Sequence, residues 1–259
     1  MIIRSAVRTD IGKVRKKNED SLGCCSELTF YIVADGMGGH QGGAVASALA
    51  VESMRRSLQS TQAEDLTPIA DSSGHYSSGG RRLEMAVHQA NNDVFERSKQ
   101  DAALEGMGTT VAAILFDLQE KVVCIGHVGD SRVYRVRDGQ LDQLTEDHSV
   151  VQQLFRHGEI DQEEMRKHPS RHMLTQALGT SAMVRPDIRI ETPQAGDMFV
   201  LCSDGVHGVI NDQELLERVT AEGQDLQNGC DGLVDLANER GGPDNSTVIV
   251  LAYEETAAQ

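Results

Sequence analysis

An aspartate that directly follows or precedes a short apolar run is the feature that most constrains this chain, and it recurs. Residues 30–34 (FYIVA) have strong strand propensity and predict a buried strand that stops at Asp35, before a glycine cluster. A carboxylate at the exit of a rigid strand, among small residues, suits the close approach of a metal ion or phosphate. Four aspartates stand beside such runs: Asp35, Asp130, Asp204 and Asp244. If these strands lie together, the four carboxylates converge and cannot all ionise without cations.

The composition excludes several kinds of partner. With 40 acidic against 24 basic residues, the formal net charge is −16, which repels nucleic acid and anionic membrane surfaces, so we expect neither as a partner. The 5 cysteines form no C-x-x-C pair, which is typical of reduced intracellular thiols rather than of a disulfide framework. No apolar run approaches membrane-spanning length. We therefore expect a cytoplasmic protein, and a monomer.

The order of the predicted elements favours an α+β fold. Strands are predicted at 2–7, 30–34, 110–116, 198–202 and 245–253, and helices at 44–58, 81–99, 149–157, 212–219 and 225–239. Residues 122–136 predict a hairpin that turns at 129–132, and Asp138-Gly139 predicts a second hairpin turn. Short strands in succession favour antiparallel sheets over a parallel doubly wound sheet.

The length suits one domain. At 259 residues the chain is ample for a single core, which we place at 1–255. A polar loop is predicted at 12–20, and the Ser-, Gly- and Asp-rich stretch 60–80 predicts a surface loop or insertion.

The aspartates and a nearby arginine together describe a metal-dependent phosphoester hydrolase. Hard oxygen ligands in a close cluster select Mg²⁺ or Mn²⁺. Two such ions ~3.5–4 Å apart can activate one water for attack on phosphorus. An arginine would hold the phosphate oxygens through paired hydrogen bonds, and Arg15 in the polar loop is the natural candidate.

Six motifs occur in order along nearly the whole chain. They are VRKKNEDS (14–21), ADGMGGHQGG (34–43), GMGTT (106–110), HVGDSRVY (127–134), LCSDGV (201–206) and GGPDNSTV (241–248). Together they resemble the metal-dependent serine/threonine protein phosphatases of the phosphatase 2C (PPM) type, specifically their compact bacterial branch. The resemblance implies a four-layer α-β-β-α sandwich, with two packed, mainly antiparallel sheets flanked by helices. It also implies hydrolysis of phosphoserine and phosphothreonine in proteins by a water that bridges two Mn²⁺ or Mg²⁺ ions, opposing bacterial Ser/Thr kinases.

The resemblance assigns metal-binding roles within the aspartate cluster. Asp35 is similar to the aspartate that bridges both metals, and Gly36 to the residue whose backbone carbonyl binds one of them. Asp204 and Asp244 match the remaining ligands of the other ion. Asp130 matches an aspartate that, with Asp204, can hold a third ion in bacterial members.

Four further residues match the surroundings of the metals. Arg15 matches the phosphate-binding arginine of the family. Glu19 and Asp20 match acidic residues that reach the metals mainly through water. Asn245 is expected just outside the ligands, where it supports them.

One position departs from the family pattern and leaves the general acid open. Some members carry a histidine directly after the Asp-Gly pair to protonate the leaving alkoxide, and here that residue is Met37. Water on a metal, His40 or a histidine near His168 can take this role. The segment 147–179 resembles the family's flap, in which His168 and His172, four apart, raise a zinc pair as an alternative, although the H-E-x-x-H pattern is absent.

Rival classes fit the sequence less well. Nucleotide binding through the glycines at 36–43 lacks the G-x-x-x-x-G-K-[ST] and G-x-G-x-x-G patterns. A cysteine-based phosphatase needs a Cys-x5-Arg loop, and no cysteine here is followed by an arginine at that spacing. A non-catalytic signalling scaffold with the same fold is the alternative, but such a protein is expected to lose metal ligands, and none is lost here. The expected partners are phosphorylated proteins and the Ser/Thr kinases that act on them.

Overall fold

Two antiparallel sheets pack face to face at the centre of the computed structural model, which describes residues 2–38, 42–64, 66–221 and 225–255. In spatial order, sheet A consists of β1 (Ile2–Asp10), β13 (Ser246–Glu254), β12 (Met198–Cys202), β9 (Arg132–Arg137) and β10 (Gln140–Gln143). Sheet B consists of β11 (Asp187–Glu191), β8 (Val122–Val128), β7 (Val111–Asp117), β3 (Phe30–Met37) and β2 (Asp20–Cys25), and the short β6 (Gly108–Thr109) pairs with the end of β3.

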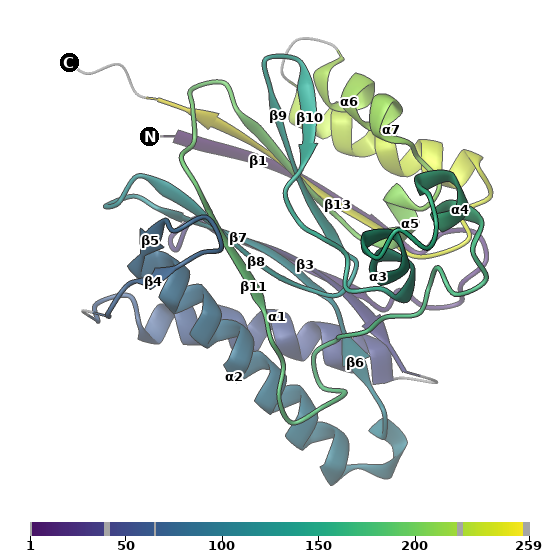
Figure 1. Ribbon diagram of the computed structural model, residues 1–259, viewed down its shortest axis with the longest axis horizontal. Helices are drawn as coiled ribbons and strands as arrows, with labels where there is room; N and C mark the ends of the chain where they lie inside the picture. The colour runs from purple at the N-terminus through teal and green to yellow at the C-terminus, as the bar shows by residue number, and fades with distance from the viewer. Residues whose placement is uncertain (1, 39–41, 65, 222–224, 256–259) are drawn as a thin grey trace.

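Helices cover the outer faces of both sheets (Figure 1). α1 (Gly42–Ser60) and α2 (Ser78–Gln100) pack on sheet B, whereas α6 (Asp212–Thr220) and α7 (Leu226–Glu239) pack on sheet A, with the one-turn α5 (Asp204–His207) after β12. One apolar cluster fills each interface between helices and sheet, and a third fills the space between the sheets. The predicted four-layer α-β-β-α sandwich is therefore confirmed.

The central strand β3 has both faces buried, which explains its continuous apolar run. Phe30 and Ile32 pack among the side chains of α1 and α2, whereas Tyr31 and Val33 pack against sheet A. Because successive side chains of a strand alternate between faces, a strand covered on both sides is apolar at every position. The predicted strand is confirmed, and it extends beyond the apolar run to Met37.

The hairpin predicted at 122–136 is wrong, because its two arms belong to different sheets. β8 pairs with β7 and β11 in sheet B, whereas β9 pairs with β12 and β10 in sheet A. Between them Gly129 adopts φ +106°, with the Thr110 side chain against it, and the chain crosses from one sheet to the other. Two apolar runs around a polar turn look the same in either arrangement. The turn at Asp138-Gly139 does join β9 to β10, with φ values of +51° and +73°.

The stretch 60–80 is more ordered than the sequence predicts. It contains a small hairpin of β4 (Ile69–Ala70) and β5 (Tyr76–Ser77). Asp71 anchors this hairpin, because its buried carboxylate accepts a hydrogen bond from the Ile190 amide of edge strand β11 at 3.0 Å. Strands β2 and β11 also escape the sequence prediction, since both are short and mix polar with apolar residues.

The predicted helices are confirmed, with their ends shifted by a few residues. α1 begins at Gly42 rather than at 44, and α2 begins at Ser78 rather than at 81. No helix within the described ranges is long and apolar enough to cross a membrane.

The segment 147–179 carries two short helices, α3 (Val150–Arg156) and α4 (Gln162–Lys167). Polar caps start both of them. The Ser149 hydroxyl accepts a hydrogen bond from a backbone amide in the first turn of α3. Asp161 forms a reciprocal capping box at the start of α4. Figure 1 shows the two helices beside α5, at the edge of the sandwich.

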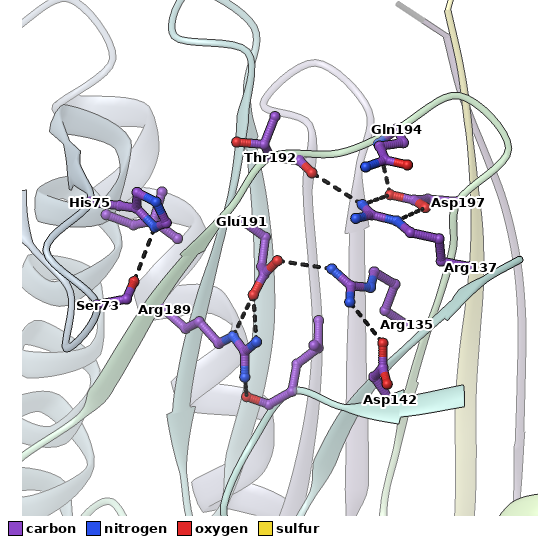
Figure 2. A network of polar contacts seen from close by, with 12 residues as sticks. Ser73, His75, Arg135, Arg137, Asp142, Arg189, Glu191, Thr192, Gln194 and Asp197 are labelled. Atoms are coloured by element: carbon purple, nitrogen blue, oxygen red, sulfur yellow. Dashed lines mark hydrogen bonds and ion pairs between the residues drawn. The ribbon is translucent and has the colours of Figure 1, made fainter. Parts of the chain in front are cut away.

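Ion pairs join the two sheets at the end of β9 opposite Asp130 (Figure 2). Arg135 of β9 donates to Glu191 of β11 at 2.9 Å. Arg137 makes two hydrogen bonds, of 2.7 and 2.6 Å, to Asp197, whose side chain is only 1% exposed. Because these groups are shielded from solvent, removing one partner would leave an uncompensated charge. The network therefore fixes how the two sheets meet at this end.

The aromatic contacts of Phe116 should make the inter-sheet core sensitive to truncation. Its ring lies 6.2 Å from that of Tyr31 in sheet B, and 5.8 and 6.3 Å from those of Phe199 and Tyr253 in sheet A. We expect Phe116→Ala to lower the free energy of unfolding by ~3–5 kcal/mol in urea titrations, since it opens a cavity between the sheets. Leu118→Ala, at a side chain 52% exposed, should change it by less than about 0.5 kcal/mol. Equal effects of both changes would contradict this view of the core.

Candidate metal centre

Asp35 enters the site from β3 with its backbone held firmly. Its amide donates to Thr110 Oγ1 at 3.0 Å, and its carbonyl accepts from the Thr110 amide at 2.9 Å. Asp20 of β2 is paired with Asp35 in the strand register, so both carboxylates project from the same face of sheet B. The Ser203 hydroxyl donates to one Asp20 oxygen at 2.7 Å. Strand pairing alone thus brings two carboxylates together.

Gly36 has no room for a side chain. A Cβ there would lie 2.1 Å from the carbonyl oxygen of Gly43 and 2.5 Å from that of Glu19. The Gly36 amide donates to the Glu19 carbonyl at 3.2 Å. The end of β3 is therefore pressed between the start of α1 and the loop before β2, which brings Glu19 to the aspartates.

Asp204 and Asp130 approach from the other sheet. Asp204 is the first residue of α5, directly after β12, and Asp130 lies in the turn where the chain crosses between the sheets. His207 of α5 donates from Nε2 to the Asp130 backbone carbonyl at 2.9 Å, which ties the turn to the helix. Beside them Arg132 makes charge-assisted hydrogen bonds of 2.9 and 2.7 Å to Asp147. This ion pair fixes the start of the flap to the same turn.

Asn245 holds the polar loop 12–20 against the site. Its Nδ2 donates to the carbonyls of Ile11 and Lys17 at 2.9 and 3.0 Å, and its Oδ1 accepts from the Glu19 amide at 2.8 Å. Both polar atoms of the side-chain amide thereby form hydrogen bonds with backbone groups. Asn245 therefore positions the loop.

Arg15 reaches the site as an ion pair with Asp244. Its Nη2 lies 2.6 Å from Asp244 Oδ2, and its side chain is 52% exposed. The hydrogen bond to Asp244 raises the pKa of Arg15. In the structure, the predicted phosphate-binding arginine therefore forms an ion pair with a predicted metal ligand.

One cavity of about 910 Å³ gathers nearly all of the predicted site residues. Its wall includes Arg15, Glu19, Asp35, Gly36, Asp130, Asp204, Asp244 and Asn245. Asp20 does not line this cavity, whereas its strand partner Asp35 does. A second cavity of about 680 Å³, lined in part by the flap helices, shares Asp130 and Asp204 with the first.

Mutual repulsion and desolvation perturb these carboxylates. Desolvation, followed by the charges of Asp20 and Asp204, holds the pKa of Asp35 well above its usual range. Desolvation and the neighbouring Asp204 raise the pKa of Asp130 to about 7, and desolvation raises that of Asp20 to about 6. Desolvation also opposes the ionisation of Asp204, but its pKa is lowered, because His172 and the proton retained on Asp35 stabilise its charge. In the absence of cations, protonation of these carboxylates reduces the repulsion between them.

The donor set fits hard divalent cations. Oδ1 of Asp20 and Oδ1 of Asp204 are buried without a hydrogen-bond partner among the described residues. Such an oxygen requires a cation or water to offset its desolvation. Oxygen ligands without sulfur or imidazole select Mg²⁺ or Mn²⁺. The aspartates are spread along the cavity rather than gathered around one point, since no three of their ligand atoms lie within 4.8 Å of one another.

The flap brings His172 to the cavity and leaves His168 outside it. His172 Nδ1 lies 3.9 Å from Asp204 Oδ2, and interaction with the Asp204 carboxylate raises the pKa of His172. α4 ends at Lys167, so the two histidines do not share a helix face, and the zinc-pair alternative loses its geometric basis. Instead, His168 Nδ1 accepts from the Ser170 amide at 3.1 Å.

Some residues around the site escape the sequence prediction. Thr110, Ser203 and His207 hold the backbone or side chains of the aspartates, yet a hydroxyl or imidazole near an aspartate is too common to single out from sequence. Met37 lines the cavity. His40, the other candidate acid, lies outside the described residues.

Among the described residues, no cysteine lines either cavity. Desolvation raises the pKa of Cys124, Cys202 and Cys230 to about 12, so these thiols stay protonated. Because the thiolate is the nucleophilic form, the structure agrees with the exclusion of a cysteine-based phosphatase.

The fold and the oxygen-lined cavity define an α-β-β-α sandwich with a site suited to divalent cations. The family model described as protein phosphatase 2C matches residues 13–234. This chain belongs to the protein phosphatase 2C family.

Named relatives agree with this assignment. The serine/threonine protein phosphatase PstP of Mycobacterium tuberculosis is 36% identical over 250 residues, which make up 96% of this chain and 45% of PstP. The serine/threonine phosphatase stp of Listeria monocytogenes is 34% identical over 252 residues, which make up 96% of this chain and 95% of stp. A crystal structure of the PstP catalytic domain in complex with 2 manganese ions matches with a TM-score of 0.83 at 34% identity, covering 98% of this chain and 99% of that one. The chain thus spans about half the length of PstP.

The raised carboxylate pKa values predict how the metal-free protein responds to pH. The folded state keeps protons on Asp35, Asp130 and Asp20 that the unfolded chain releases above pH 3.8. This cluster's contribution to stability is therefore full below pH 3.8 and is lost as pH rises toward about 7. In EDTA, Asp130→Asn should flatten the fall of Tm between pH 5 and 7, and Mn²⁺ should raise the wild-type Tm more at pH 7 than at pH 5.

A matched control for this experiment is Asp138→Asn, at an exposed turn position with φ +51° that asparagine accepts. It should keep the wild-type dependence of Tm on pH. The same slope in all three proteins would show that the aspartate cluster does not govern this response.

Proposed function

We propose that this chain is a Mn²⁺- or Mg²⁺-dependent phosphatase that hydrolyses phosphoserine and phosphothreonine in proteins. The observation that carries the proposal is the convergence of carboxylates from both sheets into one cavity, with buried oxygens that lack a hydrogen-bond donor in the described structure. Membership of the protein phosphatase 2C family and the two named serine/threonine phosphatases support the same activity. The manganese complex of the PstP catalytic domain supports the choice of metal.

The residues proposed to hold two ions are Asp35, the Gly36 carbonyl, Asp204 and Asp244. Asp35 is proposed to be shared by both ions, since it stands where sheet B faces the aspartates of sheet A. When bound, the ions supply Lewis acidity toward phosphoryl oxygens and lower the pKa of water. Glu19 and Asp20 are proposed to reach the ions mainly through water. Asn245 is proposed to keep the loop that carries Arg15 in place.

Arg15 is proposed to orient the substrate phosphate. A guanidinium carries five N–H donors in a rigid fork, and the structure records one hydrogen bond from it, to Asp244. The remaining donors are available on a side chain that is half exposed. A phosphate held there would lie beside the aspartates without displacing the arginine from the cavity wall.

A weaker third ion between Asp130 and Asp204 is part of the proposal. The two carboxylates line both cavities, and the charge of Asp204 contributes to the raised pKa of Asp130. A site with fewer protein carboxylates holds a hard cation less tightly and keeps more of its waters. An ion held by these two residues would supply acidity beside the leaving alkoxide, a role for which Met37 has no suitable group.

The wider setting follows from the activity. The proposed partners are phosphorylated proteins and the Ser/Thr kinases that produce them, and we place the protein in the cytoplasm as a monomer. Residues 1–255 are proposed to act as one catalytic domain, with 147–179 as its flap. A non-catalytic scaffold is disfavoured, because every metal-ligand position of the family pattern keeps an oxygen donor in the cavity wall.

Phosphatase assays test the proposal directly. The wild-type protein should release phosphate from phosphoserine and phosphothreonine peptides with Mn²⁺ and not with EDTA. Asp35→Asn should lower kcat at saturating Mn²⁺ by roughly 10²–10³-fold, since it removes a shared charge. Asp138→Asn should behave as wild type. Retention of a tenth of wild-type kcat by Asp35→Asn would falsify the assignment of Asp35 as a shared ligand.

Calorimetry separates the third ion from the first two. In Asp130→Ala, two Mn²⁺ ions should still bind tightly while kcat falls at least about tenfold. Binding isotherms at pH 7, recorded alongside turnover, measure both quantities on the same preparation. If the variant keeps the wild-type isotherm or the wild-type kcat, Asp130 only shapes its turn.

A further inference from the structure

A compact group of metal-ligating side chains lies behind the turn that carries Asp130, apart from the aspartate cavity. It consists of His127, His148 and Asp187, and one ligand atom from each lies within 4.8 Å of the other two. None of the three lines either cavity described above. No other grouping of three such ligand atoms occurs among the residues that the structure describes.

His127 is the first observation that points to a ligand. It is 1% exposed and lies on β8, and neither ring nitrogen makes a hydrogen bond with any described residue. The backbone of Ser131 lies close enough to favour a proton on one nitrogen without completing a hydrogen bond. A neutral imidazole with one protonated nitrogen keeps a lone pair on the other. That lone pair faces no donor in a buried position, which costs free energy unless something binds it.

Asp187 and His148 complete the group from two directions. Asp187 is the direct neighbour of His127 across the β8–β11 pair, so the two side chains share one face of sheet B. His148 comes from the start of the flap, with its ring centre 4.9 Å from that of His127. Its Nε2 lies 3.2 Å from Asp187 Oδ2. Zinc ligands ~2.0–2.2 Å from a tetrahedral ion lie roughly 3.3–3.5 Å apart, so this pair already has suitable spacing.

We propose that His127, His148 and Asp187 form a binding site for a borderline transition-metal cation, of which Zn²⁺ is the best fit. Two imidazoles and one carboxylate suit Zn²⁺ rather than the Mg²⁺ or Mn²⁺ of the aspartate cavity. The Asp187 side chain is 61% exposed, so the site opens to solvent on that side, and water can supply a fourth ligand. The three ligand atoms already lie within 4.8 Å of one another, so they are gathered on one side of a single position for the ion.

Metal binding at this site competes with a hydrogen bond that supports the Asp130 turn. The Gly129 amide donates to His148 Nδ1 at 3.2 Å, so the ring proton is on Nε2, where it faces Asp187. A cation on Nε2 takes the place of that proton, which moves to Nδ1 by exchange through solvent because the neutral ring then carries its one proton there, and two donors face each other. The Gly129 hydrogen bond is lost as the cation binds. Because Gly129 adjoins Asp130, occupation of the site opposes the geometry of the aspartate cavity and lowers turnover.

Two variants remove ligands while keeping the hydrogen bond that the Gly129 amide makes to residue 148. In His148→Asn the side-chain oxygen takes the place of Nδ1, so it can still accept from Gly129 while the ligating Nε2 is gone. Asp187→Asn keeps the shape of an exposed side chain and removes its charge. His157→Asn is the matched control, because His157 lies 3.7 Å from Glu159 in an exposed pair outside the group.

The test titrates Zn²⁺ into each full-length protein in excess Mn²⁺, by calorimetry and by turnover normalised to that protein's own rate without Zn²⁺. Wild type and His157→Asn should bind Zn²⁺ and lose turnover over the same concentration range. Both His148→Asn and Asp187→Asn should require at least about tenfold more Zn²⁺ for binding and for inhibition. Absorption of Co²⁺ in the visible range should report imidazole ligation in wild type and weaken in the two variants.

One outcome overturns the site itself, and a second overturns its coupling to Asp130. Equal Zn²⁺ affinity in wild type, His148→Asn and Asp187→Asn would place the cation elsewhere, including the aspartate cavity. Loss of Zn²⁺ binding in the two variants with inhibition unchanged would establish the site but refute its coupling to Asp130. Because binding is measured without turnover, the existence of the site is tested even if the proposed phosphatase activity fails.

Discussion

Repulsion among aspartates that two sheets deliver to one cavity is the interaction on which this structure depends. Asp35 and Asp20 project from paired strands of sheet B, while Asp204 follows a strand of sheet A and Asp130 lies in the turn that joins the sheets. Desolvation strengthens every charge interaction in such a place. The cluster is therefore either protonated or bound to cations. At neutral pH, only bound cations allow several of these carboxylates to stay ionised close together.

The rest of the fold holds these charges at a fixed spacing. Aromatic contacts around Phe116 lock the sheets in the middle, and the ion pairs of Arg135 and Arg137 lock them at the far end. At the near end, Asn245 and Gly36 fasten the polar loop by backbone contacts. Packing and hydrogen bonds therefore hold the ends of both sheets that line the cavity in place.

Much of this arrangement could be predicted from the sequence, for identifiable reasons. β3 has a long apolar run because both its faces are covered, and the aspartate that directly follows this run is visible in the pattern alone. The motifs order the aspartates along the chain and imply the layers. Pattern could not reveal that 122–136 spans two sheets, because Gly129 reverses the chain in the same way whether the next strand pairs back or crosses over. Nor could it reveal the Arg15–Asp244 pair or the approach of His172, since these depend on loop conformations that carry no periodic signal.

A crystal structure of the protein grown with Mn²⁺, with the ions located by anomalous scattering, tests the central claim most directly. The account predicts two strong peaks in the aspartate cavity, both within coordination distance of Asp35, with Asp204 and Asp244 among the remaining ligands. A third, weaker peak between Asp130 and Asp204 would agree with the proposed loose site. Peaks that do not touch Asp35, or a cavity without manganese while its carboxylates stay close together, would contradict the claim that shared divalent cations resolve the repulsion among these aspartates.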